Sequence, residues 1–294
     1  MALPAGLPGH PGGAVGHVRA GLRRLDRAQP ASPARPAGTR RPGRVTPPAL
    51  PWPGLVPTRG EEVAAAIERA GTGNPLLGIG TGTGLPAHRL CATTATPTTA
   101  TRSTAAADLI DAVAGWLAHP ERRVAASLVV LGYAARLVGP TLAVLLRDDI
   151  LLDARPHQVH YTFTPNRGFR LTLPHPTGWH PPVDQQPQAW CESVIDAHLN
   201  PLIDAVRADT PVAAGLLWGN VASGVTGALR ALADQGAVAP GRCHAVGAAI
   251  LGHGPLYGSG TLTIHDARLS FRRRSCCLYY RLDGAGTCGD CPLG

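Results

Sequence analysis

Lysine is absent from this 294-residue sequence, so arginine alone supplies its 27 basic side chains. This absence excludes a phosphate-binding P-loop, because that motif needs a lysine to contact the phosphates of a nucleotide. Glycine alternates with isoleucine or threonine over residues 78–84, which differs from the G-x-G-x-x-G spacing of dinucleotide-binding folds. We therefore predict a flexible loop there. The sequence therefore shows no flavin- or nicotinamide-binding motif.

Aromatic residues are scarce, at 4% of the chain, and Trp52 is the single one among residues 1–60. Those residues are rich in proline, alanine and glycine, and they contain nine arginines and one acid, Asp26. Such a segment cannot bury enough apolar surface to offset its ordering entropy, so we predict a disordered arm. Residues 61–294 contain 18 arginines and 18 acids, a balance that argues against nucleic-acid binding. Peripheral contact of the arm with an anionic membrane surface stays open.

The start of the chain also lacks the apolar core of a secretory signal, since prolines and glycines interrupt it. One apolar run, residues 124–146, is long enough to suggest a membrane span. Arg136 lies near its middle, where an arginine costs about 2.5–3.5 kcal/mol on insertion scales, and Pro140 follows. Because proline ends helices, we predict two buried helices, residues 122–138 and 140–146, and no transmembrane segment. The expected location is cytoplasmic, with any membrane contact at the inner face.

Hydrophobic periodicity predicts a mainly helical α+β fold with two β-hairpins, followed by a C-terminal cysteine-rich loop. Apolar residues recur at helical spacing in five further segments, which are residues 61–70, 105–117, 190–203, 211–233 and 242–251. They alternate with polar residues in two pairs of segments, which are residues 159–164 with 169–173, and 261–265 with 268–273. The predicted organisation has three parts: the arm (1–60), a short helix with a flexible linker (61–104), and one domain (105–294).

Cysteine is also infrequent, but four of the seven cysteines lie within sixteen residues. They are Cys276, Cys277, Cys288 and Cys291, in the pattern C-C-x10-C-x2-C inside residues 272–294. Disulfides need an oxidising compartment. Zinc fits the C-x2-C half, but adjacent cysteines bind a single ion poorly. A [2Fe–2S] cluster takes two thiolates on each of two irons. The spacing favours an iron–sulfur cluster, with zinc, or with inert or disulfide-bonded thiols, as the alternatives.

The sequence around these cysteines resembles that of a known family. R-R-S-C-C-L-Y-Y-R-L at residues 273–282 and C-G-D-C-P-L at residues 288–293 are similar to the C-terminal signature of the FhuF-like ferric-siderophore reductases. Residues 217–223, L-W-G-N-V-A-S, also resemble the family, as do residues 198–203. The resemblance covers roughly residues 105–294.

This resemblance implies that all four cysteines hold one [2Fe–2S] cluster. It also implies an oxidoreductase that passes one electron to siderophore-bound Fe(III), with a ferric hydroxamate as the expected substrate and an external electron donor. Reduction would release the iron, because hard oxygen ligands hold Fe(II) far more weakly than Fe(III). Two alternatives remain: an iron–sulfur electron carrier without a substrate site, and a structural zinc-knuckle protein.

Five other residues are candidates for tuning the cluster or contacting the substrate. Arg273, Arg274 and Arg281 flank the cysteines, where positive charge would stabilise the reduced cluster; a solvated strand edge is the alternative interpretation. Trp218 and Asn220 lie in a segment that resembles the family, and their alternative roles are in the core and at a helix cap. We predict ordinary structural roles for the other chemically active residues, which are His198, Cys91, Cys191 and Cys243.

Overall fold

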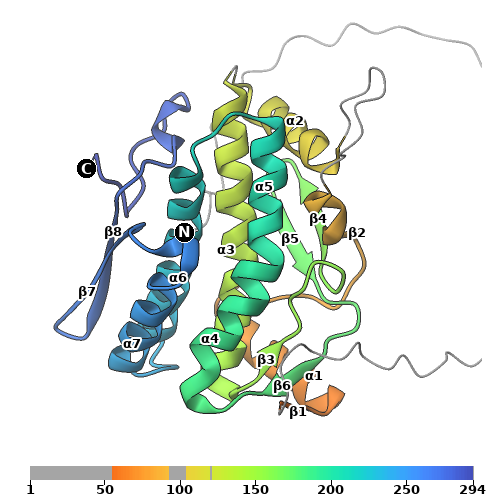
Figure 1. Cartoon of the computed structure of the whole chain (residues 1–294), viewed down its shortest axis with the longest axis vertical. Helices are drawn as coiled ribbons and strands as arrows, with labels where there is room; N and C mark the ends of the chain where they lie inside the picture. Colours follow the sequence, from red (N-terminus) through yellow and green to blue (C-terminus); the bar gives the residue numbers. More distant parts are fainter. Residues whose placement is uncertain (1–54, 93–103, 120, 294) are drawn as a thin grey trace, which may run out of the picture. The chain divides into compact units, whose positions relative to one another are not determined.

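The computed structural model describes residues 55–92, 104–119 and 121–293 (Figure 1). Most of the predicted arm and residues 93–103 of the predicted linker lie outside the described residues. The helices are α1 (Gly60–Gly71), α2 (Ala105–Leu117), α3 (Arg122–Asp148), α4 (Gln186–Trp190), α5 (Asn200–Asp209), α6 (Ala214–Asp234) and α7 (Pro240–Leu251). The strands are β1 (Val56–Pro57), β2 (Leu85–Pro86), β3 (Leu151–Leu152), β4 (His160–Thr164), β5 (Gly168–Thr172), β6 (Gly178–His180), β7 (Gly260–His265) and β8 (Arg268–Arg273). Shorter helical segments are η1 (Ala87–Cys91), η2 (Val183–Gln185), η3 (Cys191–Leu199), η4 (Gly254–Leu256) and η5 (Tyr279–Arg281).

The fold is organised around α3, which lies in the middle, with α6 on one side and the β4–β5 hairpin on the other (Figure 1). The prediction of two helices here was wrong, since α3 continues through Pro140. A proline removes only one backbone donor, and burial of α3 on nearly all sides compensates for that loss. The hydroxyl of Thr141 also donates to the carbonyls of Leu137 and Val138, at 2.8 and 3.1 Å. Helix packing therefore outweighs the local preference of proline.

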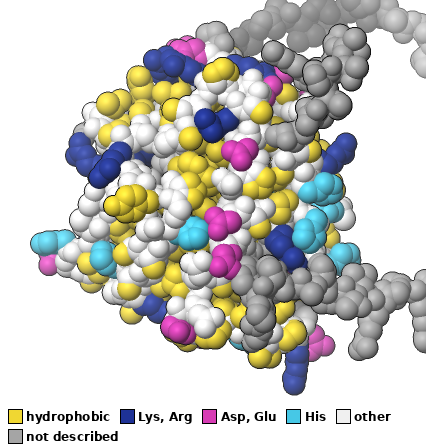
Figure 2. All heavy atoms as spheres, viewed as in Figure 1, with side chains coloured by type: hydrophobic (Ala, Val, Ile, Leu, Met, Phe, Trp, Pro, Cys, Tyr) yellow, Lys and Arg dark blue, Asp and Glu magenta, His cyan; other side chains and the backbone are white. Residues whose placement is uncertain are grey.

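Among the described residues, α3 is the one helix long and apolar enough to cross a membrane by length and composition. Within its most hydrophobic window, 78% of the residues are buried inside the protein. Basic and acidic side chains are interspersed on the face of the molecule seen in Figure 2, which agrees with the predicted charge balance.

Helices α1, α2 and α6 pack against α3. Helix α2 has the predicted bounds: Thr104 caps its start by accepting a hydrogen bond from the Ala107 amide at 3.1 Å. Helix α6 begins at Ala214, later than predicted. Thr210 does not start that helix, because its amide donates to the Val206 carbonyl at 2.9 Å and so ends α5.

The predicted hairpin β4–β5 is confirmed, with Tyr161 opposite Leu171 and Phe163 opposite Phe169. The structure also contains short strands that the sequence pattern did not predict. Strand β2 pairs with β4, and β6 lies between β1 and β3 in a second small sheet. Strands of two residues are too short to produce a recognisable alternation.

Two parts of the predicted organisation need correction. Val56–Pro57, placed in the arm, pair with β6. Residues 72–92, placed in the flexible linker, are part of the core: Leu77 is fully buried, and Gly80 exchanges backbone hydrogen bonds with the β5 region at 2.8 and 3.3 Å. The loop lies directly on α3, because a Cβ at Gly139 would overlap the carbonyl oxygen of Leu76.

The predicted helix around Pro201 is present in three successive segments. A π-helical segment, η3, joins α4 to α5, and Pro201 lies in the first turn of α5, where a missing amide hydrogen is tolerated. His198, in η3, is fully buried, as predicted for a core histidine. Its Nδ1 donates to the Ala154 carbonyl, and its Nε2 accepts from the Tyr133 hydroxyl at 2.8 Å.

The predicted hairpin β7–β8 is also confirmed, and β8 packs on α6. Residues Leu269, Phe271 and Arg273 alternate inward along β8. Ile264, an apolar residue of the predicted strand 261–265, is 38% exposed, so the alternation in that strand does not bury it. Strand β8 brings the chain to the cysteine-rich segment at the end of α6.

Candidate metal centre

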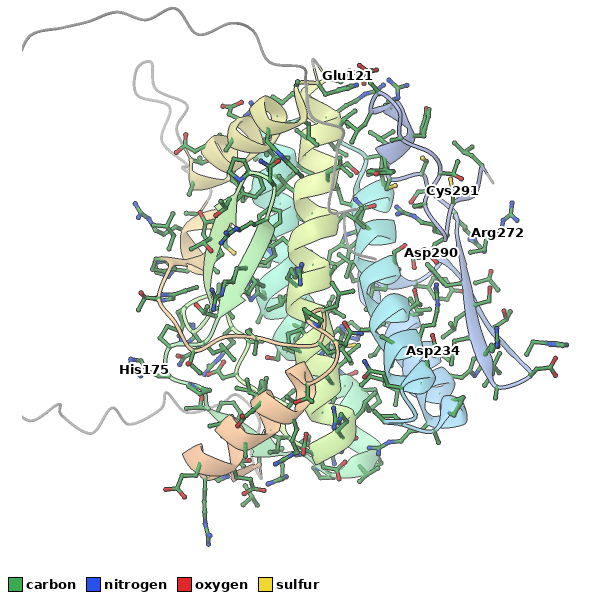
Figure 3. All side chains as sticks on the ribbon, turned by 180° about the vertical axis from the view of Figure 1, so that it is seen from behind. Glu121, His175, Asp234, Arg272, Asp290 and Cys291 are labelled. Atoms are coloured by element: carbon green, nitrogen blue, oxygen red, sulfur yellow. The ribbon has the colours of Figure 1, made fainter. Side chains whose placement is uncertain are left out.

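The structure brings the four C-terminal cysteines together. Cys276 and Cys277 follow β8, and the chain then passes through η5 and returns with a tight turn in which the Cys291 amide donates to the Cys288 carbonyl at 3.0 Å. Cys277, Cys288 and Cys291 are buried and form a small cluster of their own, against which Cys276 packs. Figure 3 shows Cys291 beside α6, at the edge of the molecule.

Sulfur positions distinguish one kind of metal site from another. The Sγ atoms of Cys277 and Cys288 lie 3.7 Å apart. Two thiolates on one tetrahedral metal, at about 2.3 Å from it, are separated by about 3.7 Å. In residues 55–92, 104–119 and 121–293, no group of three or more His, Cys, Asp or Glu side chains converges on a single metal position. Two close sulfurs with two more nearby fit the two-thiolates-per-iron pattern of a [2Fe–2S] cluster better than a single four-ligand ion.

Backbone amides support negative charge on these sulfurs. The amide of Leu278 donates to Cys276 Sγ, and the amide of Leu293 donates to Cys291 Sγ, both at 3.4 Å. Burial raises the pKa of the Cys277 thiol to about 12, and the nearby Cys288 adds to the effect. A hydrogen bond from the Tyr279 backbone and the charge of Arg273 act in the opposite direction. A metal that binds Cys277 must therefore displace a firmly held proton.

A chain of buried hydrogen bonds holds this segment to the helices. The Ser127 hydroxyl, on α3, donates to the Cys277 carbonyl at 2.7 Å. Asn220, on α6, donates from Nδ2 to the carbonyl and hydroxyl oxygens of Ser127 at 2.8 and 3.0 Å. The Nη2 group of Arg273 donates to Asn220 Oδ1 at 2.6 Å. Asn220 is thus the link between α3, α6 and β8, and it is not a helix cap.

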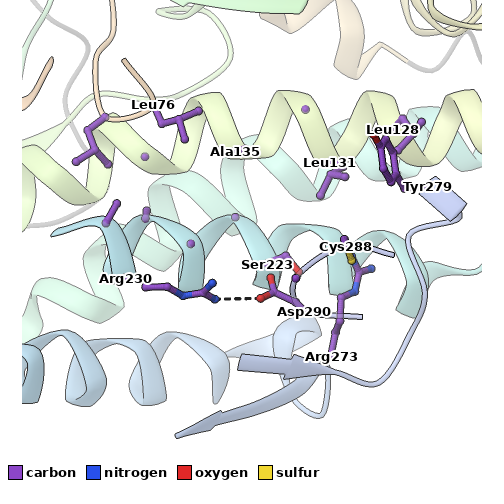
Figure 4. A pocket seen from close by; sticks show the side chains of 18 of the residues that line it. Leu76, Leu128, Leu131, Ala135, Ser223, Arg230, Arg273, Tyr279, Cys288 and Asp290 are labelled. Carbon is purple, nitrogen blue, oxygen red and sulfur yellow. Dashed lines mark hydrogen bonds and ion pairs between the residues drawn. The ribbon is translucent and has the colours of Figure 1, made fainter. Parts of the chain in front are cut away.

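Arg273 is a buried cation, with 2% of its surface exposed. Its Nε and Nη1 groups have no hydrogen-bond partner among the described residues. Its charge acts on Cys277, and it lines the same cavity as Cys288 (Figure 4). Gly219 makes this approach possible, because a Cβ there would lie 3.0 Å from Arg273 Nη2 and would overlap Ser275 Oγ. A buried unpaired cation is costly, so a site with net negative charge beside Arg273 fits these orphaned donors.

The other candidate residues lie in different settings. Arg281 pairs with Glu121, at the start of α3, and its guanidinium is 5.8 Å from the ring centre of Tyr280. Arg274 donates its backbone amide to the Ser259 carbonyl at 2.9 Å. Trp218 is 6% exposed and belongs to the main hydrophobic core.

The three remaining cysteines are far from this site in the sequence and lie in other elements, η1, η3 and α7. Burial raises the pKa of each thiol, to about 11 for Cys91 and Cys243 and to about 12 for Cys191. Cys277 has a similarly raised pKa, so the place of these three cysteines in the fold, and not their pKa, separates them from the candidate ligands.

A groove next to the cysteines was not predicted. This groove is a cavity of about 420 Å³ between α3 and α6 that extends from Leu76 to the loop at Cys288 (Figure 4). At the cluster end, Arg230 pairs with Asp290 at 3.0 Å. Small residues form its floor on both helices, and they are Gly132, Ala135, Gly139, Gly224, Gly227, Ala228 and Ala231. Their repeat at helical spacing is the sequence signal that could have indicated a groove.

Comparison with protein families agrees with this geometry. Residues 127–242 match the family described as ferric iron reductase FhuF-like transporter, and residues 273–293 match the FhuF 2Fe-2S C-terminal domain. Both matches are to the FhuF-like family, in agreement with the resemblance found in the sequence. The first match begins at Ser127 and includes Asn220, and the second begins at Arg273, so the hydrogen-bonded chain described above lies inside the FhuF-like regions. The cofactor of the C-terminal domain is a [2Fe–2S] cluster, and the family description is that of a ferric iron reductase. None of the curated proteins compared with this FhuF-like chain matches it.

Proposed function

We propose that this FhuF-like protein reduces siderophore-bound Fe(III), and that Cys276, Cys277, Cys288 and Cys291 hold its [2Fe–2S] cluster. When bound there, the cluster supplies one electron, which converts Fe(III) to Fe(II) while the cluster returns to its oxidised form. The observation that supports a substrate site is the groove that ends at Cys288. A simple electron carrier needs no cavity of this size beside its cofactor.

The residues around the cysteines have separate roles in this proposal. Ser127 and Asn220 fix the position of the Cys277 backbone, because they join it to two helices through buried hydrogen bonds. Arg273 offsets negative charge at the cysteines and so stabilises the reduced state. The ion pair Arg230–Asp290 holds the returning turn against α6.

Charge and polarity in the groove favour a ferric hydroxamate. A ferric tris-hydroxamate centre is uncharged, whereas a ferric tris-catecholate carries several negative charges. The groove is lined mainly by apolar atoms, and its charges balance, since Arg230 and Arg273 line it together with Asp234 and Asp290. Walls without net positive charge, next to a negatively charged cluster, give an anionic complex no electrostatic advantage. We therefore expect the groove to bind ferric hydroxamates more readily than ferric catecholates.

The direct test follows the visible spectrum of the cluster. Chemically reduced, anaerobic protein is mixed with a ferric hydroxamate in the presence of a ferrous chelator. We expect reoxidation of the cluster together with one trapped Fe(II) per electron. The gallium complex of the same siderophore should leave the cluster reduced, because Ga(III) accepts no electron. Failure of hydroxamate, catecholate and citrate complexes alike to reoxidise the cluster faster than buffer would refute the reductase and favour the electron carrier.

A variant tests the groove as the substrate site. A Cβ at Gly227 meets no atom within 4 Å, so Gly227→Leu fills the groove without disturbing the helices. Gly241, in α7, is equally open and lies outside the groove, so Gly241→Leu is the matched control. We expect reoxidation by the ferric complex to slow about tenfold in Gly227→Leu, or about 1.4 kcal/mol in the barrier, with an unchanged cluster spectrum. Equal rates in both variants would show that the substrate binds elsewhere.

A further inference from the structure

A second cavity, of about 390 Å³, lies between α3 and the β4–β5 hairpin. Three arginines line it: Arg136 from α3, Arg167 from the hairpin turn and Arg170 from β5. The hydroxyl-bearing residues Thr162 and Thr164 line it as well, and its lining residues include no aspartate or glutamate. The cavity, called here the cationic pocket, is therefore rich in hydrogen-bond donors and has no carboxylate to neutralise them.

The three guanidinium groups have no ion-pair partner among the described residues. Arg136 donates from Nη1 to the Pro75 carbonyl at 3.2 Å, a neutral acceptor, and burial lowers the pKa of its guanidinium. By contrast, Arg155, which is also partly buried, is paired with Asp153 at 2.7 Å. A partly desolvated arginine without an acid gains most from an external anion.

The glycine-rich loop forms another wall of this pocket. Gly78 and Gly80 line it, and backbone hydrogen bonds hold Gly80 beside β5. The side chain of Arg170 lies across Gly80, since a Cβ there would be 3.4 Å from Arg170 Nη2. The absence of side chains at these positions leaves the pocket open between Arg136 and Arg170. The alternating glycines, which match no nucleotide-binding motif, thus have a structural role next to three positive charges.

We propose that the cationic pocket binds a small anionic molecule through phosphate or carboxylate oxygens, with Arg136, Arg167 and Arg170 supplying the opposing charge. Arginine forks match the geometry of both groups. The volume lies within the range of small-molecule sites and exceeds what a single inorganic phosphate fills. This site is separate from the candidate metal centre, since none of the four C-terminal cysteines lines it.

Calorimetric titration of the cluster-loaded full chain at low salt tests the proposal. The probes are inorganic phosphate, pyrophosphate, adenosine monophosphate and citrate, so that phosphate and carboxylate ligands are distinguished. We expect saturable binding of one molecule per chain by at least one probe, weakened by added salt. Absence of saturable binding for all four at millimolar concentrations overturns the proposal.

Variants locate the site. Arg136→Gln, and separately Arg167→Gln with Arg170→Gln, should each weaken binding about tenfold or more, by loss of charge-assisted hydrogen bonds. Arg268→Gln, an exposed arginine on β8 outside the pocket, is the matched control and should change affinity less than twofold. The cluster spectrum reports whether Arg136→Gln folds. If it does not, the double variant Arg167→Gln with Arg170→Gln still tests the proposal, because it changes exposed side chains. Equal weakening by Arg268→Gln would show general charge attraction and would also overturn the proposal.

Discussion

Replacement of Arg273 by glutamine should lower the reduction potential of the cluster. Arg273 is a buried cation whose Nε and Nη1 groups are unpartnered among the described residues, and its charge acts on Cys277. Glutamine keeps a polar group of shorter length and removes the charge. Since reduction adds one negative charge to the cluster, the reduced state loses more stabilisation than the oxidised state.

The size of the shift follows from Coulomb's law. At an effective dielectric constant of about 20 and a separation of about 4–8 Å, one unit charge contributes about 2–4 kcal/mol. For a one-electron couple this corresponds to roughly 90–180 mV, with relaxation of the site favouring the lower value. Arg273→Lys keeps the charge and loses the fork that reaches Asn220, so we expect a shift less than half as large.

The assay is an anaerobic redox titration followed by visible absorption and electron paramagnetic resonance. Arg272 provides the matched control, because it lies next to Arg273 on β8 but points outward, where Nη2 donates to the Pro292 carbonyl at 3.2 Å (Figure 3). Screening by solvent should keep the shift for Arg272→Gln below about 20 mV. If the two glutamine variants shift the potential equally, Arg273 has no special electrostatic role at the cluster.

Three further predictions concern the cysteines, pH and the N-terminal boundary. Replacing any one of the four candidate ligands by serine should abolish the visible spectrum and the bound iron. The candidate ligands are Cys276, Cys277, Cys288 and Cys291. Serine at Cys91, Cys191 or Cys243 should leave both unchanged, and loss of iron there would contradict the ligand assignment. Burial lowers the pKa of His198 to about 4 from 6.5, so its contribution to stability is present above pH 6.5 and is lost as pH falls toward 4. In urea unfolding, the free energy of unfolding should fall by about 3 kcal/mol over that pH interval, and this fall should be absent from His198→Gln. If the wild type and the variant show parallel dependence of this free energy on pH, the prediction is contradicted. A chain of residues 61–294 should be less stable than one of residues 55–294 by about 1–2 kcal/mol, because it lacks the pairing of β1 with β6, and equal urea midpoints would show that this pairing contributes nothing.

Local sequence patterns were sufficient where an element depends on its own periodicity. The apolar face of α2 and the alternation in β4–β5 and β7–β8 predicted those elements, and the spacing of four cysteines predicted which thiols meet. Sequence patterns failed where contacts between residues far apart in the sequence determine the local structure. Packing around α3 overrides Pro140, and the short strand β2 exists only because β4 lies beside it.

The same limit applies to the site. Ser127 and Asn220 are 93 residues apart, and no local signal joins them to each other or to Cys277. Arg273 was a candidate because of its position in the sequence, but its burial depends on the absence of a side chain at Gly219. Trp218, a candidate from the same segment as Asn220, points into the core instead of lining the groove.

Because α3 is one unbroken helix that reaches both sites, its rise per residue gives their separation along the helix axis. Ser127, under Cys277, and Arg136, in the cationic pocket, are nine residues apart, or about 14 Å along the axis at 1.5 Å per residue. Nine residues are two and a half turns, so the two sites lie on opposite faces of α3 and are farther apart than this axial distance. A unit charge in the pocket and an electron on the cluster therefore repel by less than about 1 kcal/mol at an effective dielectric constant of about 20. Thermodynamic linkage makes this effect reciprocal. An anion bound at Arg136 would lower the cluster potential by less than about 40 mV, and reduction of the cluster would weaken anion binding less than about fivefold.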